Sequence, residues 1–263
     1  MMKRVGLTLV CIATFSVLGS ALDAKELSDL RAVYGVVREQ ARAREDCIVW
    51  YDFDDPAAQG LKFIPGPGKG VLTWKEGRWP GQKAASIFYG KLMRKAIHVP
   101  DTGFTLCCWL RVNDLEKVDR LGYKRRAGGV MVTGSGYYNG WRLLVAPGSR
   151  SLTFELGRPE IGARRLSSKG PLTVGEWHQV AITWDHETLA MWIDGQLRAE
   201  TVVTMAYVGG PKATWFRIGE CDSGLGVRSF DIPHRGIFST PLPAGGGHRL
   251  GGPDPELRKG RPP

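Results

Sequence analysis

The chain has 263 residues, of which 43% are hydrophobic, so it is long enough to build one large domain around a substantial core. Nine tryptophans and nine phenylalanines favour an interior made of β-sheet, and 35 glycines suit a fold with many tight turns. The formal net charge of +10 suits an anionic partner, but the sequence carries no nucleic-acid-binding motif, so nucleic acid is not the expected ligand.

The first 21 residues have the pattern of a secretory signal peptide. Met1–Arg4 is short and basic, Val5–Leu18 is apolar, and small residues follow up to Ala21, which predicts cleavage after Ala21 or Ala24. The apolar run is short for a transmembrane span, and nothing later in the chain resembles one. An uncleaved N-terminal anchor is the alternative. We therefore expect a secreted, periplasmic or cell-surface protein without a membrane span after signal removal.

The composition divides the chain into four parts. Leu27, Leu30 and Val33 recur at helical spacing, and this predicts a helix from Lys25 to Glu45. The C-terminal part is rich in Gly, Pro and Arg and has too few apolar residues to order itself. The predicted parts are a signal peptide (1–21), a helical lead segment (22–46), an all-β domain (47–240) and a flexible basic tail (241–263).

The stretch from Gly175 to Glu200 is the clearest β-sheet signal. Val180, Ile182 and Trp184 alternate with more polar or smaller residues, as in a strand with one buried face. A second alternating run follows from Leu189 to Ile193. Asp194-Gly195 then favours a hairpin turn, because glycine adopts positive φ without a Cβ clash. The stretch therefore predicts three strands and two reversals.

Phe104–Val112 is the most regular single strand. Its apolar face is Phe104, Leu106, Cys108, Leu110 and Val112, which predicts a central strand with that face in the core. Residues 64–70 are interpreted as a Gly/Pro loop. Further strands are predicted at 47–53, 87–88, 97–99, 129–132, 141–145, 152–156, 214–220 and 230–232. About ten or eleven short strands with this punctuation predict one antiparallel sandwich or barrel.

Four cysteines remain behind the predicted signal: Cys47, Cys107, Cys108 and Cys221. Export would permit disulfides among them, and four cysteines allow three full pairings between which the sequence does not choose. The alternative is that some or all are small buried hydrophobic residues. No cysteine or histidine spacing indicates zinc.

Several strings, among them FTLCCWLRV, GEWHQVAITW, LAMWIDGQL and TWFRIGE, come in the order found in a known family. From Cys47 to Phe238 the chain resembles laminin-G-like jelly-roll domains of the concanavalin A-like lectin/glucanase superfamily. The resemblance implies an all-β fold of two antiparallel sheets stacked face to face, with a curved binding sheet and loops at its rim. Pro233 departs from the family pattern. Because proline lacks a ladder donor, it predicts an edge, a bulge or a broken strand there.

The sequence does not point to catalysis. Glycoside hydrolases of this fold place two carboxylates on one strand, and no such string is present. Asp185, Glu187 and Asp194 lie at hairpin reversals, where aspartate forms turns. His178 has no local nucleophile or orienting partner in the sequence, so it is interpreted as structural. A divergent glycoside hydrolase or lyase remains the alternative.

One segment has the residue types of a glycan contact. Tyr137, Tyr138, Asn139 and Trp141 combine aromatic faces, which stack on sugar rings, with an amide that both donates and accepts hydrogen bonds. The competing interpretation is an aromatic strand entry that packs on the sandwich edge. Asp52 and Asp54 are candidate calcium ligands, with a solvated strand end as the alternative.

The expected function is that of a non-catalytic, extracytoplasmic module that binds carbohydrate or an extracellular protein. A structural cell-surface component that holds an anionic polymer through basic loops is a further alternative. The basic clusters are Lys117, Arg120, Lys124, Arg125 and Arg126, and Arg158, Arg164, Arg165 and Lys169. A solvated basic rim explains them equally. The sequence leaves the oligomeric state open.

Overall fold

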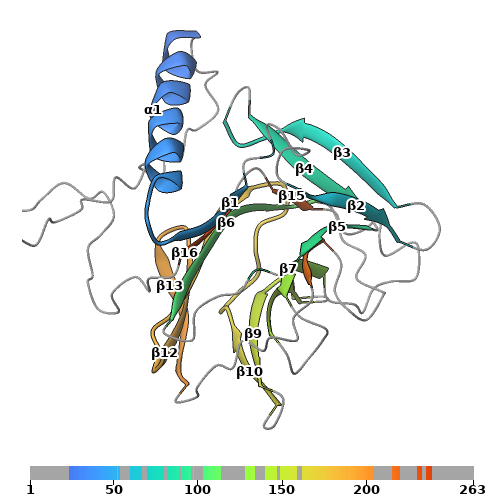
Figure 1. Cartoon of the computed structure of the whole chain (residues 1–263), viewed down its shortest axis with the longest axis vertical. Coiled ribbons are helices and arrows are strands. Elements are labelled where there is room, and N and C mark those ends of the chain that lie inside the picture. Colours follow the sequence, from blue (N-terminus) through green and yellow to red (C-terminus); the bar gives the residue numbers. More distant parts are fainter. Residues whose placement is uncertain are drawn as a thin grey trace, which may run out of the picture.

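We describe the protein from a computed structural model. It describes residues 24–51, 53, 60–66, 70–79, 82–88, 90–95, 97, 103–113, 128–133, 140–146, 149–158, 162–203, 215–219, 230–232 and 235–238. Within these residues, two antiparallel sheets of nine and seven strands are stacked face to face, and one helix stands outside them (Figure 1). The predicted all-β jelly-roll sandwich is therefore confirmed.

The larger sheet, sheet A, contains both the central strand and the predicted hairpins. Its main path is β13 (Gln196–Val202), β12 (Thr188–Ile193), β11 (Trp177–Trp184), β6 (Phe104–Val112), β15 (Phe230–Ile232), β4 (Lys83–Phe88) and β3 (Val71–Glu76). Two further strands, β16 (Arg235–Phe238) and β1 (Cys47–Tyr51), continue from β6 beside β15.

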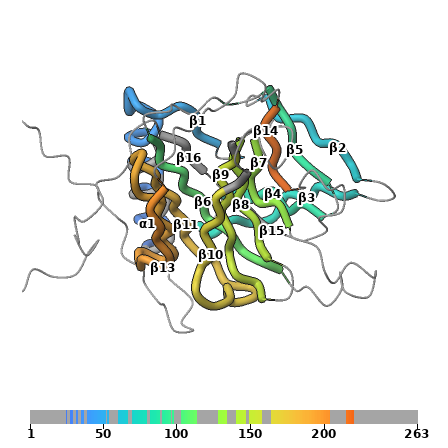
Figure 2. Tube along the Cα trace, turned by 90° about the horizontal axis from the view of Figure 1, so that it is seen from below, coloured from blue at the N-terminus to red at the C-terminus, as the bar shows by residue number. Residues whose placement is uncertain are grey.

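Sheet B forms the second layer. Its order is β10 (Gly162–Ser167), β9 (Leu152–Arg158), β8 (Gly140–Val145), β7 (Gly128–Thr133), β14 (Trp215–Gly219), β5 (Gly90–Lys95) and β2 (Lys62–Pro65). In Figure 1 the strands of sheet A arch over β7, β9 and β10 of this sheet, and Figure 2 shows the same two layers from below.

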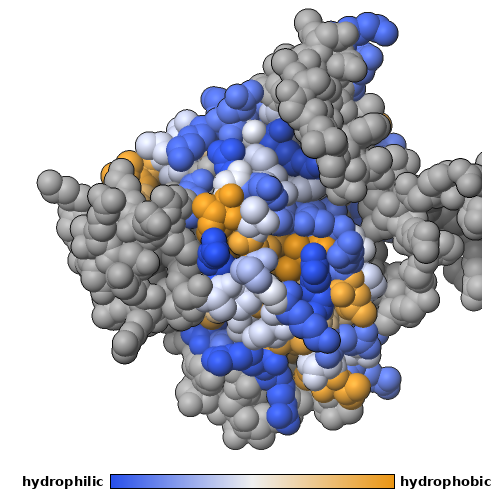
Figure 3. All heavy atoms as spheres, turned by 180° about the vertical axis from the view of Figure 1, so that it is seen from behind, coloured by the Kyte–Doolittle hydropathy of each residue, from blue (hydrophilic) through white to orange (hydrophobic). Residues whose placement is uncertain are grey.

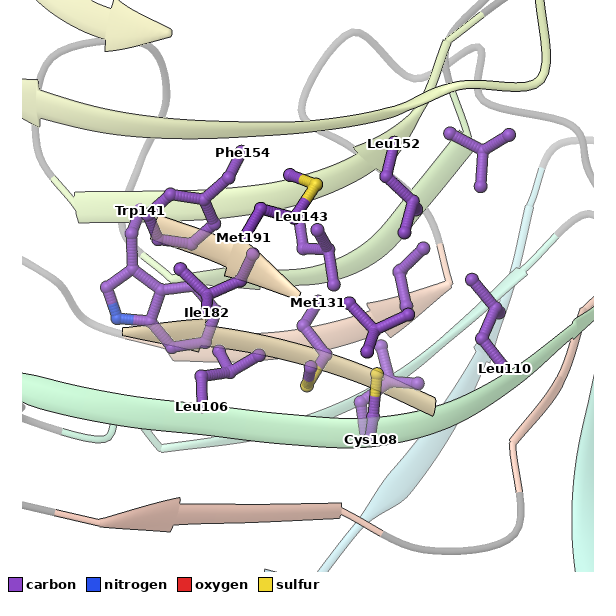
Figure 4. Packing of buried hydrophobic residues seen from close by; sticks show 14 of the residues in the cluster. Leu106, Cys108, Leu110, Met131, Trp141, Leu143, Leu152, Phe154, Ile182 and Met191 are labelled. Atoms are coloured by element: carbon purple, nitrogen blue, oxygen red, sulfur yellow. The ribbon is translucent and has the colours of Figure 1, made fainter. Parts of the chain in front are cut away.

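The core lies between the sheets and is built from every second residue of the strands. On β6 it takes the predicted set of Phe104, Leu106, Cys108, Leu110 and Val112, each at most 2% exposed. Figure 4 shows side chains of sheet A, such as those of Leu106 and Ile182, pointing toward side chains of sheet B, such as those of Trp141 and Phe154. The sheets therefore share one continuous apolar layer.

The predicted strand–turn–strand pattern of 175–200 is confirmed as β11, β12 and β13. β11 pairs with both β6 and β12, so it lies inside sheet A. Asp185 closes the first reversal, since its Oδ1 accepts the backbone N–H groups of Glu187 and Thr188. Asp194 and Gly195 form the second reversal, both with positive φ.

Proline 233 lies between two short strands that both pair with β6. β15 pairs with Val112 and Arg111 of β6, whereas β16 pairs with Cys108 to Thr105. Pro233 itself lies outside the described residues, so the predicted edge, bulge or broken strand at this position stays a prediction, while the strands on both sides of it lie inside sheet A.

The sequence prediction missed five strands. They are β2, β3, β5, β10 and β16, and β2 replaces the start of the predicted loop at 64–70. All but β16 lie at or next to the ends of the two sheets, where one face stays solvated and the apolar alternation is weak. The predicted strand at 97–99 lies mostly outside the described residues, and Ile97 itself is not in a strand.

The predicted helix is confirmed as α1 (Ala24–Arg42). It packs against β1 and stands on the side of sheet A that faces away from β7 and β9, as Figures 1 and 2 both show. Among the described residues, no helix has the length and apolarity needed to cross a membrane. The signal and tail predicted for 1–21 and 241–263 lie outside the described residues.

The described cysteines are thiols rather than disulfides. Cys47, Cys107 and Cys108 form no bridge with one another. β16 lies between the strands of Cys47 and Cys107, and two strand spacings of about 4.8 Å exceed the reach of a disulfide. Cys107 and Cys108 are neighbours that point to opposite faces of β6. The disulfide prediction is therefore wrong for these three, while Cys221 lies outside the described residues.

Candidate functional site

The outer face of sheet A, which points away from the core, carries four tryptophans. We call this surface the tryptophan face. Trp50 comes from β1, Trp109 from β6, Trp177 from β11 and Trp192 from β12. Trp109 is 9% exposed, and the other three are partly exposed. Each follows or precedes a core residue in its strand, so the period-two alternation of the strands brings all four to one side.

One row of directly paired residues crosses the tryptophan face, and we call it the floor row. It runs from Trp192 through Ala181, Cys107 and Gly236 to Trp50. Adjacent strands lie about 4.8 Å apart, so four spacings separate the two tryptophan α-carbons by roughly 19 Å. The half-buried Ala181 and Cys107 are small. The row therefore places a floor of small residues between two indoles, over a length that suits a few sugar rings.

Arginines stack on the other two tryptophans of the face. The Arg78 Cζ atom lies 3.5 Å from the ring centroid of Trp109 and 4.6 Å from that of Trp79. The Arg111 Cζ atom lies 4.6 Å from the centroid of Trp177, its direct cross-strand neighbour. Cation–π contacts of this kind contribute about 0.5–2 kcal/mol each and fix both groups. The face thus combines aromatic surface with oriented hydrogen-bond donors.

The link between α1 and β1 borders this face. Arg44 and Asp46 form an ion pair at 2.6 Å, and the hydrogen bond to Asp46 raises the pKa of Arg44. The link ends at Cys47, the first residue of β1, and Trp50 belongs to the same strand, so the link lies at the Trp50 side of the tryptophan face.

His178, at the start of β11, forms a polar pair with Asp194, which directly follows β12. The Nδ1–H of His178 donates to Asp194 Oδ2 at 2.7 Å, and this bond raises the pKa of His178. The second oxygen, Oδ1, accepts the Gln179 N–H at 2.9 Å, and His178 Nε2 accepts the Thr173 N–H at 3.2 Å. A backbone amide thus stands where a catalytic dyad would hold its nucleophile, which supports the interpretation of His178 as structural.

The described carboxylates are used in folding. Asp185 and Asp194 close turns, and Glu155 is 2% exposed and ion-paired with Arg142 and Arg165. These three therefore do not form the acid–base pair that a glycoside hydrolase needs. The described residues also contain no group of three or more His, Cys, Asp or Glu side chains that could hold a metal ion.

The outer face of sheet B is basic, and we call it the basic face. Its charged side chains are Lys62, Lys91, Lys95, Arg142, Arg165 and Arg217, with Glu155 as the acid between Arg142 and Arg165. Its centre is buried, since Arg217 is 2% exposed and lies with its Cζ 3.2 Å from the Trp215 centroid. The exposed charges are those of Lys62, Lys95 and Arg165, on strands at or next to the ends of the sheet.

Of the candidate site residues predicted from the sequence, the structure describes one. Tyr137, Tyr138 and Asn139 lie outside the described residues, in the connection from β7 to β8, and so do Asp52 and Asp54. Trp141 is in the core at 1% exposure, and its ring lies 6.1 Å from that of Phe154 and 6.4 Å from that of Phe104. In this structure its indole is not open to a ligand.

The sequence interpretation did not single out the tryptophan face. The signal was present in β6 and β11, where Trp109, Arg111, Trp177 and Gln179 occupy the positions opposite the core residues. Their convergence depends on the register between strands, and the contribution of Trp50 depends on the pairing of β1 with β16. Neither register can be deduced from local periodicity.

Comparison with protein families gives one match. A laminin G-type family model, described as the concanavalin A-like lectin/glucanases superfamily, matches residues 89–232, which is more than half of the chain. The chain belongs to the concanavalin A-like lectin/glucanases superfamily. The matched range includes β6, β11 and β12, and so most of the tryptophan face. No curated protein matches the sequence.

Solved structures with the same fold include binding domains of clostridial neurotoxins. The binding domain of botulinum neurotoxin serotype G has a TM-score of 0.57 at 10% identity, over 75% of this chain and 48% of that one. The binding domain of botulinum neurotoxin DC, in complex with SialylT, has a TM-score of 0.52 at 12% identity, over 76% and 49%. The same domain with rat synaptotagmin II has a TM-score of 0.53 at 12% identity, over 76% and 49%.

These likenesses show a shared fold. This chain spans about half the length of the neurotoxin domains that it matches. At 10–12% identity, side-chain roles do not transfer between the chains, so the site must be argued from the residues of this chain.

Proposed function

We propose that this protein is a non-catalytic binding module whose ligand is a carbohydrate that lies across the tryptophan face. The observation that carries the proposal is the floor row, in which Ala181 and Cys107 lie low between the indoles of Trp192 and Trp50. Aromatic faces stack on sugar rings, and small residues let a ring approach the sheet. Gln179, beside Trp109, adds an amide that donates and accepts.

The binding roles of similar folds support this proposal without extending to its ligand. The binding domain of botulinum neurotoxin DC is in complex with SialylT in one solved structure and with rat synaptotagmin II in another. A protein partner is therefore the second candidate here. On the side of the molecule seen in Figure 3, hydrophobic residues form several patches separated by hydrophilic ones. On the tryptophan face itself, Arg78, Arg111 and Gln179 lie among the tryptophans, whereas the centre of a large stable protein interface is depleted of charged residues, so a polar ligand is favoured.

The test is a glycan array probed with the labelled protein and with two single variants, Trp50→Ala and Trp192→Ala. We expect the wild-type protein to bind a defined set of glycans, and each variant to weaken that binding about tenfold, since each removes one stacking surface. Trp74→Ala is the matched control, because Trp74 is a 41% exposed tryptophan of β3 outside the tryptophan face. Unchanged binding by both face variants would reject the tryptophan face as the site.

A second contact region is proposed at Tyr137, Tyr138 and Asn139, which lie between β7 and β8 in the sequence. Both flanking strands belong to sheet B, whereas the floor row belongs to sheet A. Replacing Tyr137 and Tyr138 by alanine together tests it on the same array. A loss of binding in this double variant with normal binding in Trp192→Ala would move the carbohydrate site to sheet B.

An anionic polymer is the alternative ligand that the basic face favours. Lys62, Lys95 and Arg165 are its exposed charges, and ionic binding there would weaken strongly between low and physiological salt. Carbohydrate binding by stacking would change little with salt. Binding that is lost in salt and in Lys62→Gln/Arg165→Gln, but kept in Trp192→Ala, would favour this alternative.

The proposal places the module outside the cytoplasm. Its support is the sequence of residues 1–21, with a basic start, an apolar run and small residues before Ala21. Expression of the full chain with N-terminal sequencing of the exported product tests it. A mature chain that begins at Leu22 or Lys25 is the expected result, and retention of Met1 in a cytoplasmic product would contradict it.

A further inference from the structure

Arg78 is held over the tryptophan face in a geometry that leaves hydrogen-bonding capacity for a ligand. Its Cζ atom stacks on Trp109 at 3.5 Å and lies 4.6 Å from the Trp79 centroid. Among the residues that the structure describes, no hydrogen bond or ion pair joins its guanidinium to an acceptor. A stacked guanidinium keeps its five N–H donors in its own plane, where they fit a carboxylate or sulfate in a two-pronged contact.

The β3–β4 turn positions this arginine. Gly77 N–H donates to the Gln82 carbonyl at 2.7 Å, and Gln82 N–H donates to the Trp79 carbonyl at 3.0 Å, so the turn is closed on both sides of Arg78. Trp79 and Gln82 are themselves buried at 9% and 5% exposure. The arginine therefore projects from a packed turn rather than from a loose loop.

The charge of Arg78 is only partly balanced. Burial lowers the pKa of Arg78 to about 10, because the guanidinium loses water, while Asp194 acts in the opposite direction. Both Asp194 oxygens are already bonded, one to His178 and one to Gln179 N–H. Asp194 thus offers Arg78 long-range attraction without a hydrogen bond. An external anion would supply the acceptors that the protein does not.

The position of Arg78 relative to the floor row indicates which part of a ligand it would meet. Trp109, on which it stacks, is two residues along β6 from Cys107, or about 7 Å along the strand. This is close to the length of one sugar ring. A sugar that stacks above Cys107 and Ala181 would therefore present a ring substituent to the guanidinium.

We propose that Arg78 binds an oxyanion on the ligand, so that the tryptophan face selects acidic sugars that carry a carboxylate or a sulfate ester. This inference rests on the proposed carbohydrate function, because it assigns the ligand class of the same surface. Stacked aromatic surface supplies contact that neutral and acidic sugars share, and Arg78 supplies the contact that only the acidic ones make.

The first test is a glycan array that holds neutral, carboxylated and sulfated forms of the same backbones, probed with wild type, Arg78→Lys and Arg78→Gln. We expect wild type to prefer acidic glycans. Lysine keeps the charge but loses the planar fork, so Arg78→Lys should lose about tenfold in affinity for them, and Arg78→Gln more. The carboxylated and sulfated arms identify the anion. Arg164→Lys, an exposed arginine of sheet B, is the matched control.

The outcomes separate this inference from the proposed function. Neutral glycans bound as well as acidic ones, with loss in Trp50→Ala and Trp192→Ala but not in Arg78→Gln, would overturn the inference and leave the function standing. Equal losses for neutral and acidic glycans in Arg78→Lys would also overturn it, because they would mark Arg78 as a support for Trp109.

A second measurement covers the case in which no glycan binds. The Arg78 Nε–H signal, identified in a proton–nitrogen NMR spectrum by its loss in Arg78→Lys, is followed while sodium sulfate or sodium acetate replaces sodium chloride at constant ionic strength. If no glycan binds, a saturable shift with either anion supports an oxyanion site at Arg78. In that case the array result counts against the carbohydrate function and the shift keeps the oxyanion site. A signal that does not respond to either anion overturns the inference.

Discussion

Asp194 Oδ2 lies 2.7 Å from His178 Nδ1, so the residue that forms the turn after β12 also holds the ring at the start of β11. The same carboxylate accepts the Gln179 N–H at 2.9 Å. The Asp194 side chain thereby holds the end of β12 against the start of β11. It also positions Gln179, which lies opposite Trp109 on the tryptophan face.

This pair predicts a pH dependence of stability. The hydrogen bond to Asp194 raises the pKa of folded His178 above 6.5, so its contribution is complete below that pH and is lost as the pH rises through the folded-state pKa. Burial alone would raise the pKa of Asp194, but the bonds from His178 and Gln179 lower it below 3.8, so its contribution is lost only in stronger acid. Stability should therefore fall from slightly acidic toward alkaline pH.

Asp194→Asn is the variant that tests this dependence, because asparagine also tolerates the positive φ of 53° at this position. Without the charge, the His178 pKa should return toward its ordinary value, and the fall in stability above about pH 6.5 should disappear. Urea unfolding at several pH values, with an NMR titration of the His178 ring, measures both. An unchanged His178 pKa in the variant would show that Asp194 does not cause the shift.

Glu155 should be the costliest carboxylate to remove. It is 3% exposed in its side chain and ion-paired with Arg142, which is 17% exposed, and with Arg165, which is 57% exposed. Glu155→Ala leaves Arg142 without this partner in a half-buried place and should lower the free energy of unfolding by about 3 kcal/mol. Arg165→Ala removes only a solvent-exposed partner, so we expect less than about 1 kcal/mol. Equal losses in urea unfolding would contradict this assignment.

Gly140 should not tolerate a side chain. Its φ is +145°, and a Cβ atom there would lie 2.4 Å from the Thr133 carbonyl oxygen. Gly140→Ala should therefore destabilise the protein by more than roughly 2 kcal/mol, since both backbone and contact oppose it. Gly170→Ala is the matched control, because its φ of +81° is also positive but the space around it is open, and we expect about 1 kcal/mol. Thermal unfolding of both variants compares them, and similar losses would show that backbone strain alone acts.

Local periodicity was enough to predict an antiparallel sandwich or barrel and much of its core, and the family resemblance favoured the sandwich. The alternation in β6 and β11 identified which of their residues face inward, and Asp194-Gly195 marked the turn. Trp141 shows why the candidate site could not be predicted the same way. Its position beside Tyr138 and Asn139, at the start of a predicted strand, suggested a glycan contact, yet it is the first core-facing residue of β8.

The tryptophan face was not predicted for a related reason. A tryptophan on the outer side of a strand has the same local pattern whether it lies alone or in a cluster. What brings Trp50 into one row with Trp192 is the chain of pairings from β1 through β16, β6 and β11 to β12. Long-range pairing of this kind is set by the whole fold.

Trp141 allows a direct test of the structure against the sequence interpretation. Its indole packs against Phe104, Phe154 and Phe216, with centroid distances of 6.4, 6.1 and 6.1 Å. Trp141→Ala should therefore lower the free energy of unfolding by about 3–5 kcal/mol, and Trp141→Phe by less, because phenylalanine fills part of the space. The affinity of folded Trp141→Phe for a glycan found on the array should equal that of wild type. If Trp141→Phe instead had a normal unfolding midpoint but weakened glycan binding, Trp141 would be a ligand contact, as its sequence neighbours suggested.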